Sequence, residues 1–126
     1  MPKNETPQYK EKYQTFLSDY QAGITSGERV GFLIAELSNF FAEYNMLAGQ
    51  QEKALNQEAA KIVNGTDEAT GKPLSVAKAD ILIKATYAHA ESKMTKIHLE
   101  NIDGFLNSLK KLQLGILNEF SHMGNN

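Results

Sequence analysis

Lysine side chains recur along the last third of the sequence, where they could bind the phosphate groups of a nucleic acid. Residues 75–122 contain no proline, and their apolar residues recur every three or four positions, so the pattern predicts one long helix there. On such a helix, five lysines fall within roughly one third of the circumference, opposite the apolar face: Lys78, Lys93, Lys96, Lys110 and Lys111. Because Glu100 and Asp103 lie in the same stripe, we favour a solvated helix face over the alternative, a DNA-binding surface.

Polar side chains also interrupt the apolar face of this predicted helix: Asp80, Tyr87, Asn101 and Glu119. A polar group on a buried helix face is unfavourable unless it is hydrogen-bonded. One interpretation is that these residues fix the register and oligomeric state of packed helices. The alternative is a polar ligand, such as a nucleotide, held between helices near Lys84. We favour the first interpretation and keep Tyr87, Asn101 and Glu119 as candidate binding residues.

Two short motifs resemble functional signatures, but neither is complete. Residues 65–72 (GTDEATGK) resemble a phosphate-binding loop, yet the spacing is one residue too long and Pro73 replaces the required Ser or Thr. Glu119 and His122 have the spacing used by carboxylate-bridged di-metal bundles, which need a second such pair and two further glutamates. The other histidines lack partners at metal-ligand spacing. We therefore expect no catalytic residue, no metal ion, no cofactor and no enzymatic activity.

The composition is ordinary for a soluble protein, with 126 residues, 41% hydrophobic and 22% charged content, and no cysteine. The net charge of −2 gives no general argument for a nucleic-acid partner. Residues 1–71 hold 6 basic and 10 acidic side chains, whereas residues 72–126 hold 7 and 5, so two helices or two subunits could attract each other. No stretch resembles a signal peptide or reaches membrane length. These features predict an intracellular protein without a membrane partner.

Three helices are expected, near residues 7–22, 26–64 and 75–122, with a loop at 65–74. Thr6 with Pro7, a Thr25–Glu28 capping box, and Ser75 are the predicted helix starts. The second helix carries a heptad of apolar residues: Val30, Leu33, Leu37, Phe40, Tyr44 and Leu47. The third carries Ile83, Tyr87, Ala90, Met94 and Ile97, followed by Ile102, Phe105, Leu109, Leu112 and Ile116.

A short loop between two long helices predicts an antiparallel hairpin. The fold class is therefore all-α: one domain, residues 1–126, in which a short N-terminal helix with an aromatic face packs on a bundle-like or coiled-coil-like hairpin. The loop end, rich in Gln, Asn and Ala, should bury little apolar area, and so should be mobile or packed on another subunit. Apolar residues flanking the predicted seams suggest a homo-oligomer, with a dimer favoured: Phe32, Ile34, Phe41, Ile81, Leu82, Leu99 and Leu114.

Several segments resemble small helical proteins encoded by tailed phages and prophages. They are Lys78–Ala79, residues 101–112 (NIDGFLNSLKKL) and 115–123 (GILNEFSHM), with 49–56 and 66–75 also similar. The resemblance covers about two thirds of the chain and assigns no catalytic residue. It implies a phage protein whose gene lies near genes for recombination or single-strand binding.

Together these observations predict a non-enzymatic, oligomeric helical accessory protein that binds protein or DNA in recombination or replication. One alternative is an anti-defence protein that sequesters a small ligand such as a nucleotide. Another is a structural component of the virion. If the chain is phage-encoded, its expected location is the host cytoplasm.

Overall fold

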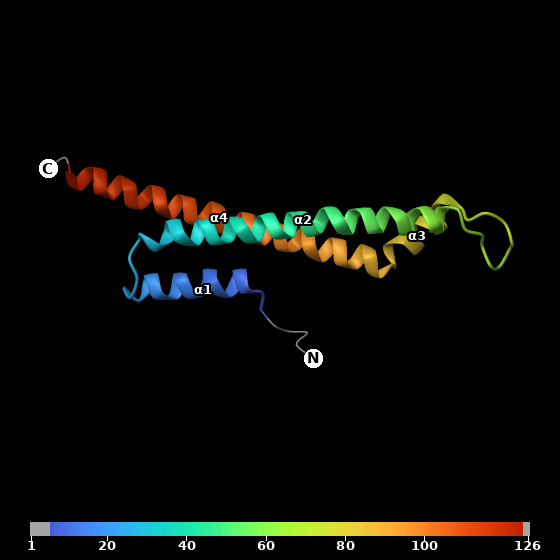
Figure 1. Ribbon diagram of the computed structural model, residues 1–126, viewed down its shortest axis with the longest axis horizontal. Coiled ribbons are helices and arrows are strands. Elements are labelled where there is room, and N and C mark those ends of the chain that lie inside the picture. The colour runs from blue at the N-terminus through green and yellow to red at the C-terminus, as the bar shows by residue number, and fades with distance from the viewer. Residues whose placement is uncertain (1–5, 125–126) are drawn as a thin grey trace. The chain divides into compact units, whose positions relative to one another are not determined.

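Four helices make up the computed structural model, which describes the backbone of residues 6–124 and the side chains of residues 6–119. They are α1 (Gln8–Gln21), α2 (Arg29–Val63), α3 (Val76–Lys84) and α4 (Tyr87–Gly124), as Figure 1 shows. Of the residues that the structure describes, 80% are helical, and α2 packs against α4. In the described part of the chain, β structure is limited to one isolated bridge between Thr66 and Pro73. The predicted all-α helical hairpin is confirmed.

The predicted helix over residues 75–122 is wrong in one respect, because it is interrupted between Lys84 and Tyr87. The Thr86 hydroxyl donates to the Ile83 carbonyl at 2.7 Å and accepts from the His89 amide at 3.1 Å. Thr86 thus caps the start of α4, a role in which threonine is favoured. The apolar spacing continues across the break, so periodicity alone did not reveal it.

The other helix starts agree with the sequence only in part. The Ser75 hydroxyl accepts from the Lys78 amide at 3.2 Å and caps α3, as predicted. The Thr25–Glu28 capping box is wrong, because α2 begins only at Arg29. The Thr25 hydroxyl instead accepts a hydrogen bond of 3.4 Å from the Arg29 guanidinium. Before α1, Pro7 occupies the cap position and its side chain makes no capping hydrogen bond.

The chain divides into two compact units. Unit 1 comprises Met1–Glu43 and Glu100–Asn126, and unit 2 comprises Tyr44–Leu99. Both α2 and α4 run through the two units. That residues 1–126 behave as a single domain stays a prediction. None of the described helices has both the length and the apolar composition that crossing a membrane requires.

Unit 1 holds an aromatic and aliphatic core between α1, the first part of α2 and the last part of α4. Its fully buried side chains are Tyr9, Phe16, Val30, Leu37, Ile102 and Leu109. The Tyr13 ring stacks on the Phe105 ring at a centroid distance of 4.0 Å, and the Tyr9 ring lies 6.4 Å from Phe40. The predicted apolar faces of α2 up to Leu37 and of α4 from Ile102 onward therefore meet in this core.

Unit 2 has a different interior, and the predicted apolar face of its α4 segment is wrong. Ser92 and Thr95 are buried, with exposed fractions of 6% and 4%. The predicted face contained a step of five residues, from Ile97 to Ile102, which rotates the stripe by roughly 140°. The inward face of α4 can instead be followed back from Ile102 in steps of three or four residues. It then runs through Leu99, Thr95 and Ser92. This part of α4 therefore turns small polar residues inward.

Candidate binding surfaces

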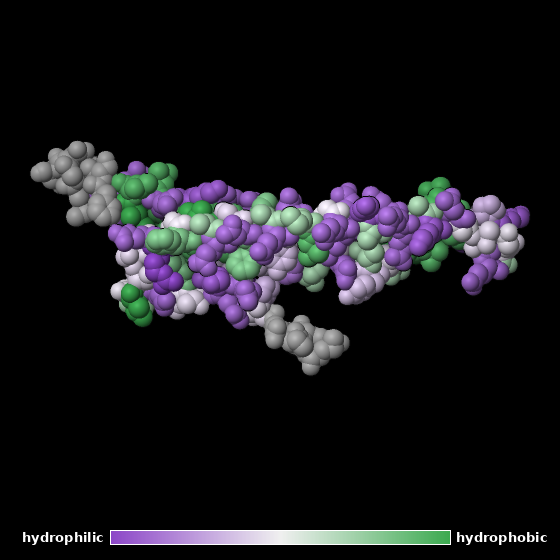
Figure 2. Space-filling view, viewed as in Figure 1, coloured by the Kyte–Doolittle hydropathy of each residue, from purple (hydrophilic) through white to green (hydrophobic). Residues whose placement is uncertain are grey.

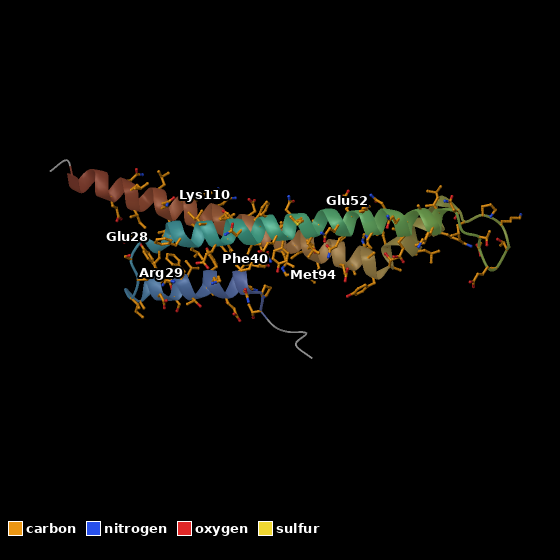
Figure 3. The ribbon with its side chains drawn as sticks, in the orientation of Figure 1. Glu28, Arg29, Phe40, Glu52, Met94 and Lys110 are labelled. Atoms are coloured by element: carbon orange, nitrogen blue, oxygen red, sulfur yellow. The ribbon has the colours of Figure 1, made fainter. Side chains whose placement is uncertain are left out.

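Four of the five predicted lysines lie on α4, and the fifth does not. Lys78 lies on α3, which is separate from α4, so a common helical wheel does not apply to it. Its ammonium group is paired with the Asp67 carboxylate. Lys93 and Lys96 are exposed on the unit 2 segment of α4. The remaining two, Lys110 and Lys111, are exposed in unit 1; Figure 3 labels Lys110.

The predicted polar set does not converge on a ligand site either. Tyr87 belongs to unit 2 and is 78% exposed. Its pKa is raised by the hydrogen bond to the Glu91 carboxylate and by the negative charge of that group. Asn101 and Glu119 are exposed in unit 1, and their 18-residue separation corresponds to about 27 Å along α4. The Asn101 amide donates to the Tyr9 hydroxyl at 3.4 Å.

Asp80 is likewise exposed. Its carboxylate lies 3.1 Å from the ammonium group of Lys84, which follows it by four residues on α3. The prediction that the four polar residues lie on the buried side of a helix is therefore wrong. The break at Thr86 places Asp80 on a separate helix, and the five-residue step misplaces the inward face of α4 around Tyr87. The positions of Tyr87, Asn101 and Glu119 give no support to a nucleotide held between helices.

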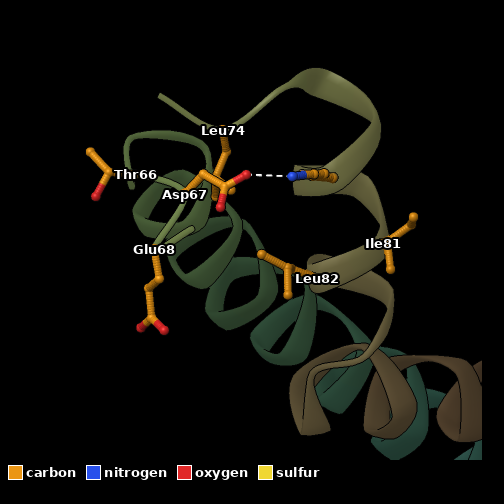
Figure 4. Close-up of a pocket in the computed structure, with 7 residues that line it drawn as sticks. Thr66, Asp67, Glu68, Leu74, Ile81 and Leu82 are labelled. Carbon is orange, nitrogen blue, oxygen red and sulfur yellow. Dashed lines mark hydrogen bonds and ion pairs between the residues drawn. The ribbon is translucent and has the colours of Figure 1, made fainter. Parts of the chain in front are cut away.

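An open pocket that the sequence did not predict lies in unit 2, between the loop and α3 (Figure 4). Its volume is about 470 Å³. An apolar wall faces an ion pair and a neighbouring carboxylate, and the lining residues are Thr66, Asp67, Glu68, Leu74, Lys78, Ile81 and Leu82. Leu74, Lys78, Ile81 and Leu82 recur at helical spacing, which is the signal that could have revealed it.

The Asp67–Lys78 pair holds the loop against α3. The Asp67 carboxylate also accepts a hydrogen bond from the Ala69 amide at 2.9 Å. The pKa of Asp67 is lowered, first by its hydrogen bond from Lys78 and then by that from the Ala69 amide. Because these two charged groups pair with each other, the remaining lining consists of the Glu68 carboxylate, the Thr66 hydroxyl and apolar side chains.

The histidines give no metal centre among the residues whose side chains are described, since no group of three His, Asp or Glu residues lies close enough to hold a metal ion. His98 packs its ring against Tyr44 at a centroid distance of 5.0 Å. Burial lowers the pKa of His98 below its ordinary value of 6.5. The side chain of His122, the second half of the Glu119–His122 motif, lies outside the described residues.

The largest candidate surface is apolar and belongs to unit 2. Nine of the thirteen large hydrophobic side chains exposed in the described range lie in this unit, and we call them the unit 2 apolar surface. They are Met46, Leu47, Val63, Val76, Ile81, Leu82, Tyr87, Met94 and Ile97. Hydrophobic side chains are visible on the surface near α3 in Figure 2, and Figure 3 labels Met94 on α4.

The interior of unit 2 is correspondingly poor in apolar side chains. Of the nine buried hydrophobic residues described, only Ala79 belongs to unit 2. The side-chain oxygen of Gln51 is buried there, and no hydrogen-bond partner for it is present among the described residues. The half-buried aliphatic side chains of unit 2 larger than alanine are Leu55, Ile62, Leu74, Ile83 and Leu99. Among the described residues, unit 2 thus has fewer buried and more exposed large apolar side chains than unit 1.

Comparisons with protein-family models, with curated proteins and with solved structures find no match to this chain.

Proposed function

We propose that this chain is a non-enzymatic helical accessory protein that acts by binding another protein chain through the unit 2 apolar surface. The observation that supports the proposal is the large number of exposed apolar side chains in unit 2. Ordering a residue costs about 1–2 kcal/mol of conformational entropy, which burial of apolar area at about 25 cal/mol per Å² must offset. With Ala79 as its one described buried hydrophobic residue, unit 2 needs a partner that covers its exposed side chains.

A protein partner suits this surface better than DNA does. Residues 44–99 contain seven lysines and six acidic residues, so the unit has nearly balanced charge. DNA binding depends mainly on the neutralisation of phosphates by clustered basic groups. Exposed Leu, Ile, Met and Val side chains are covered instead by the apolar face of another helix. Lys93 and Lys96 then serve as polar groups at the edge of a protein interface.

The resemblance to small helical proteins of tailed phages supports a proposal about where the protein acts. On that basis the protein serves phage recombination or replication in the host cytoplasm, as an accessory factor without catalysis. Self-association is one form that its protein binding takes. The sequestering and virion alternatives have less support, because Tyr87, Asn101 and Glu119 do not converge and no observation points to a capsid or tail.

Site-specific photo-crosslinking tests the proposal. A photoreactive benzoylphenylalanine replaces Met94 in unit 2, and in a matched variant it replaces Lys110 in unit 1. Irradiation of cells that express each variant should give one defined protein adduct for the Met94 position only. Excess wild-type protein should suppress that adduct. If neither position gives a protein adduct, the proposed function is wrong.

A mobility-shift assay at low salt tests the DNA alternative. The wild type should bind neither single-stranded nor double-stranded DNA, because unit 2 is nearly neutral. Binding that weakens on changing Lys93 and Lys96 to Gln would replace the protein partner with DNA. Changing Lys110 and Lys111 to Gln gives the matched control in unit 1.

A further inference from the structure

We infer that the break between α3 and α4 is a conformational switch. The Thr86 hydroxyl holds the bent form described above, in which α3 does not continue the axis of α4 (Figure 1). In the second form, α3 and α4 are one continuous helix and α3 has turned about its own axis. The inference goes beyond the proposed function and does not depend on it. Three features of unit 2 carry it: the hydrogen bonds at the break, the burial of α3, and the ion pair between α3 and the loop.

The side chain of Thr86 makes the break. Residues 84–87 (KATY) contain neither proline nor glycine, so the bend needs another cause, such as a side chain inserted among the backbone hydrogen bonds. In a continuous helix the Ile83 carbonyl accepts from the amide four residues later. Here it accepts from the Thr86 amide at 3.1 Å and from the Thr86 hydroxyl at 2.7 Å. The His89 amide donates to the same hydroxyl at 3.1 Å, so one hydroxyl serves both sides of the break.

Without this hydroxyl, the local sequence favours a continuous helix. Lys84 and Ala85 belong to residue types with high helix propensity. Ala85 already has helical backbone angles, with φ of −86° and ψ of −7°. A continuous helix would replace the hydrogen bonds of the Thr86 hydroxyl with ordinary backbone hydrogen bonds. The bend therefore depends on a side chain rather than on the backbone.

The burial of α3 differs from the burial that a continuous helix would give it. The inward face of α4 in unit 2 includes Ser92, which is 6% exposed. At about 100° per residue, a continuous helix would place Ile81 about 20° from Ser92 and Ala79 about 140° from it. The structure has the opposite order, because Ala79 is 5% exposed and Ile81 is 67% exposed. In the bent form α3 is thus turned about its own axis relative to α4.

The continuous form would bury more apolar area from α3. Ile81 would take the inward position that Ala79 holds in the bent form, and burial stabilises in proportion to apolar area. The neighbouring helix α2 offers a matching face, since Leu55, Ala59 and Ile62 are half-buried and extend to its last turn. A second arrangement of α3 therefore has both a helix-forming sequence and a surface to pack against.

The Asp67–Lys78 ion pair opposes this turn of α3. The loop holds Asp67 in place, because the Ala69 amide donates to its carboxylate at 2.9 Å and its own amide donates to the Lys72 carbonyl at 2.7 Å. The Asp67 side chain is 14% exposed, and salt screens a partly buried pair less than an exposed one. Turning α3 would carry Lys78 away from this carboxylate. The bent form is therefore held by the ion pair and by Thr86.

The switch would change what unit 2 presents at its surface. Three of the nine residues of the unit 2 apolar surface lie on α3: Val76, Ile81 and Leu82. All three are exposed in the bent form. In the continuous form Ile81 would leave the surface. The state of the break would thus alter the unit 2 apolar surface without any change elsewhere in the chain.

Distance measurement between two spin labels tests the switch. The chain has no cysteine, so Val76→Cys and Lys93→Cys, both at exposed positions, give specific attachment points. In a continuous helix these 17 positions correspond to about 25 Å between Cα atoms, and a bend shortens that distance. With Thr86 present the labels should show the shorter distance. Thr86→Ala should lengthen it towards about 25 Å, and adding Asp67→Asn should complete the change.

Thr86→Ser is the matched control, because serine keeps the hydroxyl and is favoured at the start of a helix. It should retain the shorter distance. An unchanged distance in Thr86→Ala with Asp67→Asn overturns the inference. The same lengthening in Thr86→Ser also overturns it, because the hydroxyl would then not hold the bend.

Thiol alkylation reports the turn of α3 independently. Ile81→Cys should react quickly with iodoacetamide when Thr86 is present, and about tenfold more slowly with Thr86→Ala, if about nine-tenths of the molecules are then continuous. Val76→Cys is the control, since it would lie about 160° from Ser92 on a continuous helix and should react equally fast in both backgrounds. Fast alkylation of Ile81→Cys with a broad distance distribution would mean that Thr86→Ala unfolds α3. That result overturns the inference, because the hydroxyl would then stabilise α3 instead of selecting between two forms.

Discussion

At the scale of single residues, stability is concentrated in the core of unit 1. Leu37 and Ile102 are fully buried, and removal of a large aliphatic side chain from such a position leaves a cavity. Each of Leu37→Ala and Ile102→Ala should lower the free energy of unfolding by about 2–5 kcal/mol in urea denaturation. The exposed Gln57 is the control, and Gln57→Ala should change the free energy of unfolding by less than about 0.5 kcal/mol. Equal losses at all three positions would contradict this assignment of the core.

His98 gives stability a dependence on pH. Its pKa in the folded protein is lowered from 6.5 by burial, so the unfolded chain binds a proton more readily than the folded chain does. The contribution to stability is therefore complete above pH 6.5 and is lost as the pH falls through the lowered folded value. Thermal melts between about pH 8 and 5 should show a decline that His98→Gln reduces. His89→Gln is the control substitution, and a decline that His98→Gln leaves unchanged would rule out this cause.

At the scale of the elements, two glycines with open surroundings differ in their backbone conformation. Around Gly104 in α4, a Cβ atom would have no neighbour within 4 Å. Since glycine is about 1 kcal/mol less favourable than alanine within a helix, Gly104→Ala should raise the free energy of unfolding by about that amount. Gly71, in the loop, has a φ of 69°, and Gly71→Ala should be destabilising. Urea denaturation measures both, and a destabilised Gly104→Ala would contradict the open surroundings found at that position.

The elements also show what a sequence can and cannot predict here. The period of three to four residues predicted every long helix, and the Ser75 cap was found because its local signal is strong. The break at Thr86 was missed because apolar residues keep their spacing across it. The inward face of α4 in unit 2 was missed because it consists of Ser92 and Thr95, while larger apolar residues suggested the opposite side. A prediction that assumes apolar residues inside fails in unit 2, where large apolar side chains are exposed.

At the scale of the whole molecule, the two units should differ in local stability. Unit 1 contains eight of the nine described buried hydrophobic residues, and amide protons exchange most slowly where apolar burial is densest. In unit 2, Ala79 is the one described hydrophobic residue that is buried, and under the proposed self-association another copy would cover its exposed apolar side chains. Its protection against hydrogen exchange should therefore depend on protein concentration by mass action, whereas that of unit 1 should not.

Hydrogen exchange followed by mass spectrometry measures this directly. Peptides from residues 44–63 and 87–99 should exchange quickly at about 1 μM and become protected as the concentration rises a hundredfold. Peptides from residues 29–43 and 100–113 should keep the same protection throughout. A double variant, Leu47→Glu with Met94→Glu, places charges on two exposed apolar positions of unit 2. Its unit 2 peptides should exchange quickly at every concentration, because the charges oppose self-association. If amide exchange in unit 2 of the wild type is slow at every concentration, its own interior is enough to stabilise it. Self-association would then not be what protects this unit.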